Sequence, residues 1–138
     1  MEHVNITTDI LSLEEARRRL PALRPHVLAL MEIATELVDV NNTLQDISER
    51  QGDHETDKRR LLARSRELAQ GYERELKAVN DLGAVMKDPT AGLLDFYAWK
   101  DDDLVFLCWK YGEDTIRHWH ALSEGFRGRR PVEELSRP

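Results

Sequence analysis

Two long segments of this chain carry apolar residues at steps of four and three, and this spacing constrains the fold more than any other feature. Such steps keep one seam of a helix turned toward a partner helix. The first stripe is Leu23, Val27, Leu30, Ala34, Leu37, Asn41 and Leu44, and the second is Leu61, Ser65, Leu68, Tyr72, Leu76, Val79, Leu82 and Met86. Because only the polar run 51–57 separates the two segments, the sequence predicts a long antiparallel helical hairpin with coiled-coil-like packing.

The start of the first segment carries helix signals of its own. Ser12 and Glu15 have the spacing of a capping box, which predicts a short N-terminal helix. Pro21 and Pro25 follow, and proline disrupts the hydrogen-bond ladder in the interior of a helix. We therefore expect a kink here, between the short helix and a long helix that ends near Arg50.

After the second stripe the apolar period changes from that of a helix to that of a strand. Residues 93–99 and 104–111 are rich in aromatic and aliphatic side chains, which predicts a two-stranded β-hairpin. With the turn at 101–102, Asp95 should lie opposite Cys108. One face of the hairpin would then carry Leu94, Phe96, Ala98, Val105, Leu107 and Trp109, and the other Asp95, Tyr97, Trp99, Phe106 and Cys108.

The next segment, 113–124, is interpreted as a C-terminal helix. Its apolar side would carry Ile116, Trp119, His120 and Ser123, which follow helical spacing. His118 and His120 are two residues apart, so on a helix their side chains would point in different directions.

These elements together predict a mainly α fold: a long antiparallel helical hairpin with a short N-terminal helix, a two-stranded β-hairpin and a C-terminal helix. The size favours a single domain over residues 1–138. Its expected parts are a helical hairpin region (12–86), the β-hairpin with the C-terminal helix and an arginine-rich loop (92–131), and a tail (132–138).

Composition excludes several classes of partner. The net charge is −6 and the pI about 5.4, whereas broad nucleic-acid or anionic-membrane binding needs a positive field. No apolar run approaches the roughly 18 residues of a membrane span. A lone cysteine, Cys108, cannot form an internal disulfide, and the N-terminus shows no signal-peptide pattern. We therefore expect a cytoplasmic protein without nucleic-acid or membrane partners.

The candidate site lies in the aromatic-rich part of the chain, where five residues could form a ligand site or a structural polar cluster: Asp95, Cys108, Glu113, His120 and Arg129. The sequence favours a structural network, because buried polar groups find partners. A small-ligand site is the next reading. No standard metal motif is present, so no metal centre is assigned; the alternative metal set is Cys108, Glu113 and His120.

Two members of this cluster suggest more specific chemistry. Cys108 would need a nearby base such as His120 to act as a nucleophile, and a strand cysteine beside Trp109 is more often a small buried hydrophobe. Arg129 could clamp a carboxylate or phosphate of a ligand. The sequence favours instead an ion pair that closes the C-terminus, with Glu113, Asp114 or Glu124 as the partner.

Motifs along most of the chain resemble a bacterial family, the domain of unknown function family 2203. The matching residues are Leu13-Glu14-Glu15-Ala16, Leu20-Pro21-Ala22-Leu23-Arg24-Pro25, Gly92, Asp95-Phe96, Val105, Leu107-Cys108-Trp109, Gly112-Glu113, Ile116, Trp119-His120, Gly125-Phe126, Gly128-Arg129 and Pro131. Tyr97 departs from the pattern, which has proline after the Asp-Phe pair. The resemblance implies a fold but no activity.

The sequence leaves the function open between two classes. The leading hypothesis is a non-enzymatic interaction or scaffold protein that self-associates as a homodimer, and that could also bind another protein. The alternative is a small-ligand or metal-binding protein, which could be an enzyme, with its site at the predicted β-hairpin and C-terminal helix. No residue pattern identifies a cofactor, a substrate or a pathway.

Overall fold

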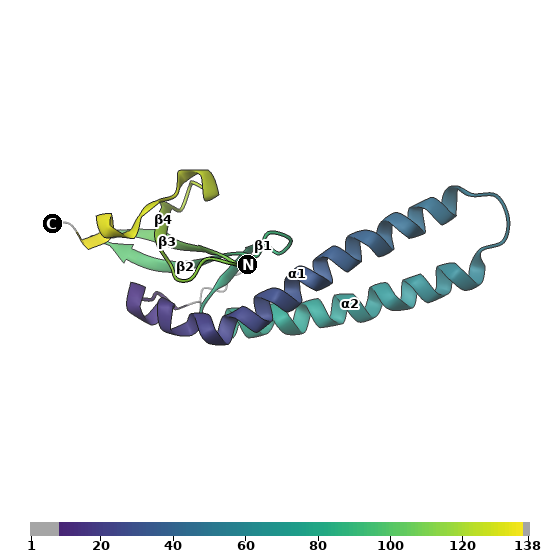
Figure 1. Cartoon of the computed structure of the whole chain (residues 1–138), viewed down its shortest axis with the longest axis horizontal. Helices are drawn as coiled ribbons and strands as arrows, with labels where there is room; N and C mark the ends of the chain where they lie inside the picture. Colours follow the sequence, from purple (N-terminus) through teal and green to yellow (C-terminus); the bar gives the residue numbers. More distant parts are fainter. Residues whose placement is uncertain (1–8, 137–138) are drawn as a thin grey trace.

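The computed structural model describes residues 9–136, and two long antiparallel helices dominate it (Figure 1). Helix α1 spans Leu13–Glu49 and helix α2 spans Glu55–Asp81. The predicted capping box is present: the Glu15 backbone N–H donates to Ser12 Oγ at 3.1 Å, and the Ser12 N–H donates to Glu15 Oε1 at 2.9 Å. Between the helices, Gly52 adopts a φ of 107°, a value that favours glycine.

The separate short N-terminal helix is wrong, because α1 runs through both Pro21 and Pro25. Both prolines lie on the exposed side of α1, where water can hydrate the carbonyl groups that lose their helical partners. Neighbouring arginines also anchor this part of α1 to the loop between β3 and β4. Arg17 donates to the Ile116 carbonyl at 2.7 Å, and Arg24 donates to the Asp114 carbonyl at 2.8 Å. Tertiary packing therefore outweighs the local cost of the two prolines.

The predicted mainly α fold with a lone two-stranded hairpin is wrong, because the hairpin is part of a five-stranded antiparallel sheet, whose strands follow one another in chain order. The strands are β1 (Val85–Asp88), β2 (Leu93–Lys100), β3 (Asp103–Lys110), β4 (His118–Ala121) and β5 (Arg130–Pro131). The predicted register of the central pair is confirmed: Asp95 lies opposite Cys108, and Phe96 lies opposite Leu107. The additional strands cover edges that a lone hairpin would leave with unpaired backbone groups.

The predicted C-terminal helix is also wrong, because its central residues form β4. Trp119 packs into the core from β4, while His118 and His120 point to the other face of the sheet. Four residues at helical spacing were too few to decide between the two periods, and the free edge of β3 needed a partner. Short 3-10 helices follow at Phe126–Gly128 and Val132–Ser136, and residues 137–138 of the expected tail lie outside the described part.

The predicted end of the second long helix is also wrong. Helix α2 ends at Asp81, and Met86, expected to be helical, belongs to β1. Gly83, with a φ of 87°, makes the turn that ends the helix. Leucine, valine and methionine occur at buried positions both in helices and in short strands. Their spacing alone therefore does not show where the helix ends and the strand begins.

The core lies between α1 and one face of the sheet. It combines Leu20, Leu23, Val27 and Leu30 from α1 with Leu94, Phe96, Ala98, Val105, Leu107 and Trp109 from the hairpin. The hairpin residues are those predicted to share a face. Residues 32–71 lie outside this core cluster and project beyond the sheet as a two-helix extension, which we call the helical arm (Figure 1).

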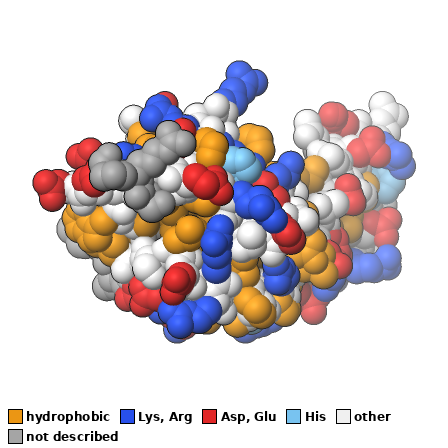
Figure 2. Space-filling model, turned by 60° about the vertical axis from the view of Figure 1, so that its left-hand side comes forward, with side chains coloured by type: hydrophobic (Ala, Val, Ile, Leu, Met, Phe, Trp, Pro, Cys, Tyr) orange, Lys and Arg blue, Asp and Glu red, His pale blue; other side chains and the backbone are white. Residues whose placement is uncertain are grey.

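The face of the molecule in Figure 2 shows no broad field of one charge. In the space-filling view, lysine and arginine side chains alternate with aspartate and glutamate, with hydrophobic side chains between them (Figure 2). Within residues 9–136, no helix is long and apolar enough to span a membrane.

Candidate metal centre

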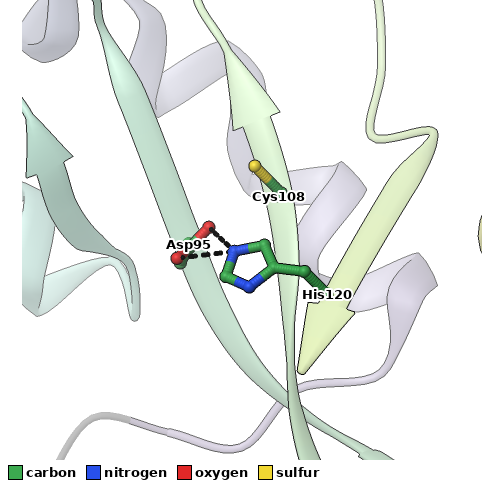
Figure 3. A group of neighbouring side chains, drawn as sticks. All are labelled: Asp95, Cys108 and His120. Carbon is green, nitrogen blue, oxygen red and sulfur yellow. Dashed lines mark hydrogen bonds and ion pairs between the residues drawn. The ribbon is translucent and has the colours of Figure 1, made fainter. Parts of the chain in front are cut away.

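The sheet face opposite α1 brings three chemically active side chains together. Asp95 comes from β2, Cys108 from β3 and His120 from β4, three neighbouring strands (Figure 3). Their ligand atoms all lie within 4.8 Å of one another. Asp95 and His120 are each 2% exposed, and Cys108 is fully buried. A carboxylate, a thiol and an imidazole thus meet where water is excluded.

The hydrogen bonds of His120 show that one particular ring nitrogen carries a hydrogen. Nδ1 lies 2.8 Å from the Ala121 carbonyl oxygen, which can only accept, so Nδ1 must carry a hydrogen. Nε2 lies 3.0 and 3.1 Å from the two carboxylate oxygens of Asp95. If the ring is neutral, the Nε2 lone pair faces the lone pairs of that carboxylate. A proton or a metal cation must therefore lie between them.

Aromatic side chains cover this pair. The Phe106 ring lies 5.4 Å from the His120 ring and 4.7 Å from the Tyr97 ring, between centroids. Lys87 Nζ lies 4.2 Å from the centroid of Phe106 and adds a positive charge near Asp95. These aromatic contacts help to exclude water from the polar groups on the sheet face opposite α1.

Burial dominates the titration of Asp95 and Cys108. It raises the pKa of Asp95, and the nearby His120 only partly opposes this. Burial and the Asp95 carboxylate raise the pKa of the Cys108 thiol to about 12. The metal-free thiol is therefore protonated at neutral pH, and both nitrogens of His120 already face oxygen atoms. This geometry does not support Cys108 as a nucleophile activated by His120.

The other two predicted site residues form a separate pair. Arg129 donates to Glu113 at 2.7 and 2.9 Å, which confirms the ion pair expected to close the C-terminus. Burial alone would raise the pKa of Glu113, but hydrogen bonds from Arg129 and from the Lys110 backbone hold it below the usual value. Arg129 also donates to the Cys108 carbonyl at 3.4 Å. The predicted cluster of five is thus two pairs that meet at Cys108.

The structure therefore changes the predicted metal set. Asp95, not Glu113, shares the site with Cys108 and His120. Prediction of the set depended on the register of the strands, since Asp95 and Cys108 are cross-strand neighbours and His120 reaches them from the next strand.

Sequence comparison adds a family to this geometry. The family model described as "Uncharacterized conserved protein (DUF2203)" matches residues 10–132. The chain belongs to the DUF2203 family. No curated protein and no solved structure matches it. The resemblance seen in the sequence motifs is confirmed, and it carries no activity with it.

The prediction of a helix over 113–124 leaves one further residue of this DUF2203 chain, His118, out of the candidate site. On β4, His118 points to the same sheet face as His120, because side chains alternate along a strand. Its Nδ1 atom is buried and has no hydrogen-bond partner among the described residues. A His-x-His sequence would have indicated a shared face if this segment had been interpreted as a strand.

Proposed function

We propose that this chain is a metal-binding protein in which Asp95, Cys108 and His120 hold a divalent transition metal such as Zn²⁺. The observation that carries the proposal is the contact between His120 Nε2 and both oxygens of Asp95, with Nδ1–H already donated to the Ala121 carbonyl. Histidines that ligate metals usually donate their other N–H to a backbone carbonyl or a carboxylate, which fixes the ring. His120 has this arrangement, with Nδ1 on the Ala121 carbonyl and Nε2 toward Asp95.

The charges of the three ligands suit a divalent cation. An aspartate and a cysteine thiolate supply two negative charges, and a neutral histidine adds none, so the occupied centre would be neutral. Neutrality matters here because an uncompensated charge is costly in a buried site. Carboxylate, thiolate and imidazole are all ligands of zinc, and ligand atoms in a tetrahedral zinc centre lie roughly 3.3–3.8 Å apart. The observed separations extend from 3.0 Å, between His120 Nε2 and Asp95 Oδ2, to at most 4.8 Å, so side-chain rotations would have to bring the atoms into this range.

The burial of the three residues favours a structural role for the metal. Closed sites stabilise folds, whereas catalytic sites keep an open coordination position. A metal here would join β2, β3 and β4 on the face that α1 does not cover. We therefore propose a non-enzymatic protein, with a metal-stabilised sheet and a helical arm available for interactions. The unpaired thiol suits a reducing compartment, in keeping with the expected cytoplasmic location.

Cobalt substitution tests the metal centre directly. Co²⁺ bound by Cys108 produces a thiolate-to-metal charge-transfer absorption, and the chain has no other cysteine. We expect this band with the wild-type protein and its loss in Cys108→Ser. The band should weaken strongly in Asp95→Asn but persist in Glu113→Gln, a matched control that removes the other carboxylate near Cys108.

Two other outcomes would contradict this metal centre. A purified protein without metal that shows no cobalt band would leave Asp95 and His120 as a structural pair that shares a proton. A band that persists in Asp95→Asn but is lost in Glu113→Gln would restore the alternative set of Cys108, Glu113 and His120. Elemental analysis of the purified protein identifies the metal.

Self-association is a second candidate property, and the helical arm supplies the observation that favours it. Val38 on α1 and Leu62 on α2 are large aliphatic side chains that are each 51% exposed. A second copy that packs on the arm would cover them. Light scattering should then give about twice the chain mass of 16.0 kDa, and a constant 16.0 kDa over a wide concentration range would contradict the idea.

A further inference from the structure

The segment His118-Trp119-His120 lies in strand β4, where successive side chains point to opposite faces of the sheet. Trp119 points into the core, so the flanking histidines both point to the face that carries Asp95 and Cys108. The chain therefore places two imidazoles, a thiol and a carboxylate on one face of three adjacent strands.

Strand register places His118 beside the centre. Cys108 pairs with Asp95 on one side and with His118 on the other, so these three residues form one row across the sheet. Directly paired residues in an antiparallel sheet have Cβ atoms roughly 4.5–5.5 Å apart. His120 belongs to the adjacent row, where it pairs with Phe106. Cys108 thus has a potential ligand on each side and a third from the next row.

His118 also has an unexplained buried atom. Its Nδ1 has no hydrogen-bond partner among the described residues, although buried polar atoms are rarely left unpaired. Two other buried side-chain nitrogens share this condition, Trp119 Nε1 and Arg129 Nε. Those two can only donate a hydrogen, whereas a histidine nitrogen can offer a lone pair. Of these three orphaned atoms, only His118 Nδ1 can bind a cation.

We propose that His118 is the fourth ligand of the metal centre. This inference rests on the proposed metal-binding function and completes it, because closed structural zinc sites are four-coordinate and tetrahedral. A neutral histidine adds no charge, so the centre of two histidines, one aspartate and one cysteine remains neutral around a divalent cation. His118 does not belong to the group whose ligand atoms all lie within 4.8 Å of one another, so it would reach the metal only by rotation of its side chain toward Cys108.

Titration with Co²⁺ separates a ligand from a merely neighbouring residue. In His118→Gln, we expect the affinity for Co²⁺ to fall by more than the ~10–100-fold that loss of a second-shell partner costs. The d–d absorption should change, because it reports the coordination of cobalt, while the thiolate band from Cys108 persists. The matched control is His26→Gln, a histidine on α1 that pairs with Glu75 and should leave both affinity and spectrum unchanged.

A second variant keeps the test valid if His118→Gln folds poorly. His118→Cys replaces the ligand by one of a different kind, so the thiolate-to-cobalt absorption should approximately double. Unchanged affinity and d–d absorption in His118→Gln, or no additional charge-transfer absorption in His118→Cys, would overturn this inference and leave the three-ligand centre standing. No cobalt binding by the wild-type protein would overturn both proposals.

Discussion

The sheet contains a buried pair of titratable side chains, whereas the ion pairs of the helical arm lie at the surface. The side chains of His120 and Asp95 are only 3% and 2% exposed. On the arm, Arg64 and Glu36 approach to 2.6 Å but remain 46% and 43% exposed. Similar ion-pair chemistry therefore has different consequences. A buried pair is costly to break, because the remaining group keeps its burial without its partner, while an exposed pair adds little to stability.

Apolar burial is also more extensive around the sheet than in the arm. The sheet and the base of α1 share a continuous core with buried tryptophans, but the arm has only a thin seam between two helices. The buried residues of that seam are Ala34, Val40, Ile47 and Leu68. Stability and candidate chemistry are thus concentrated at one end of the molecule, and the arm depends on a narrow strip of contacts.

The largest expected effect compares two tryptophans of the central hairpin. Trp109 is fully buried, its Nε1 donates to the Glu113 carbonyl at 3.0 Å, and Trp109→Ala should cost about 3–5 kcal/mol of unfolding free energy. Trp99 is 57% exposed, and Trp99→Ala should cost about 1 kcal/mol or less. Urea unfolding measures both. Equal losses would mean that the two faces of the hairpin are wrongly assigned.

The next largest effect is expected at a buried histidine pair, in comparison with a half-exposed one. In metal-free protein, His120→Ala leaves Asp95 buried alone and should cost about 3 kcal/mol, near the lower end for a broken buried pair. The raised pKa of Asp95 limits the loss, because the carboxyl can take up a proton. His26 pairs with Glu75 at 2.7 Å near the surface, so His26→Ala should cost ~0–1 kcal/mol. Comparable losses would remove the distinction between buried and exposed pairs.

Hydrogen exchange should reveal the thin seam of the arm. Backbone amides at the tip of the arm, residues 44–60, should exchange through local openings of much lower free energy than those of β2 and β3. The reason is that few buried apolar contacts hold the tip closed. Native-state exchange followed by mass spectrometry measures this. Protection at the tip as strong as in β3 would contradict it and would support a second copy packed on the arm.

The smallest effect concerns pH. The pKa of Glu113 lies below its usual value of 4.5 in the folded protein, so its ionised form stabilises the fold above pH 4.5. That contribution is lost as the pH falls through the folded pKa. Glu113→Gln should therefore destabilise the protein at pH 7 but much less at pH 3. Unfolding in urea at both pH values measures the difference.

High salt should distinguish the stability contribution of the Glu113–Arg129 pair from that of the Glu36–Arg64 pair on the arm. Glu36 is also held below its usual pKa, by Arg64, but the pair is exposed. Any effect of Glu36→Gln should disappear in 1 M salt, where exposed charges are screened. The effect of Glu113→Gln should largely persist, because burial protects its pair. Equal salt sensitivity would show that the Glu113–Arg129 pair is as solvated as the arm pair.

Sequence patterns were most reliable where a signal was both long and local. The stripes of the two helices extend over many turns, and the capping box at Ser12 has a defined spacing, so both were recognisable. The register of β2 and β3 followed from a short turn and from the alternation of two apolar strands. The Glu113–Arg129 pair was among the predicted alternatives because its residues lie close to each other along the chain.

The candidate metal centre was only partly visible in the sequence. The chemistry of Asp95, Cys108 and His120 makes them candidates in the sequence, but a helix over this segment would turn His118 away from them. One residue of difference in a strand reverses the face of a side chain, while two residues restore it. The interpretation of this segment as helix or strand thus decided which residues could meet.

By itself, the sequence determined the helical hairpin, the central strand pair and the set of polar residues that had to be buried or paired. Each of these depends on periodicity and spacing within one segment. The tertiary structure decided that α1 runs through its prolines, that β1, β4 and β5 extend the sheet, and that Asp95 pairs with His120. These depend on contacts between distant segments, whose packing and backbone pairing outweigh the weaker local preferences of short stretches.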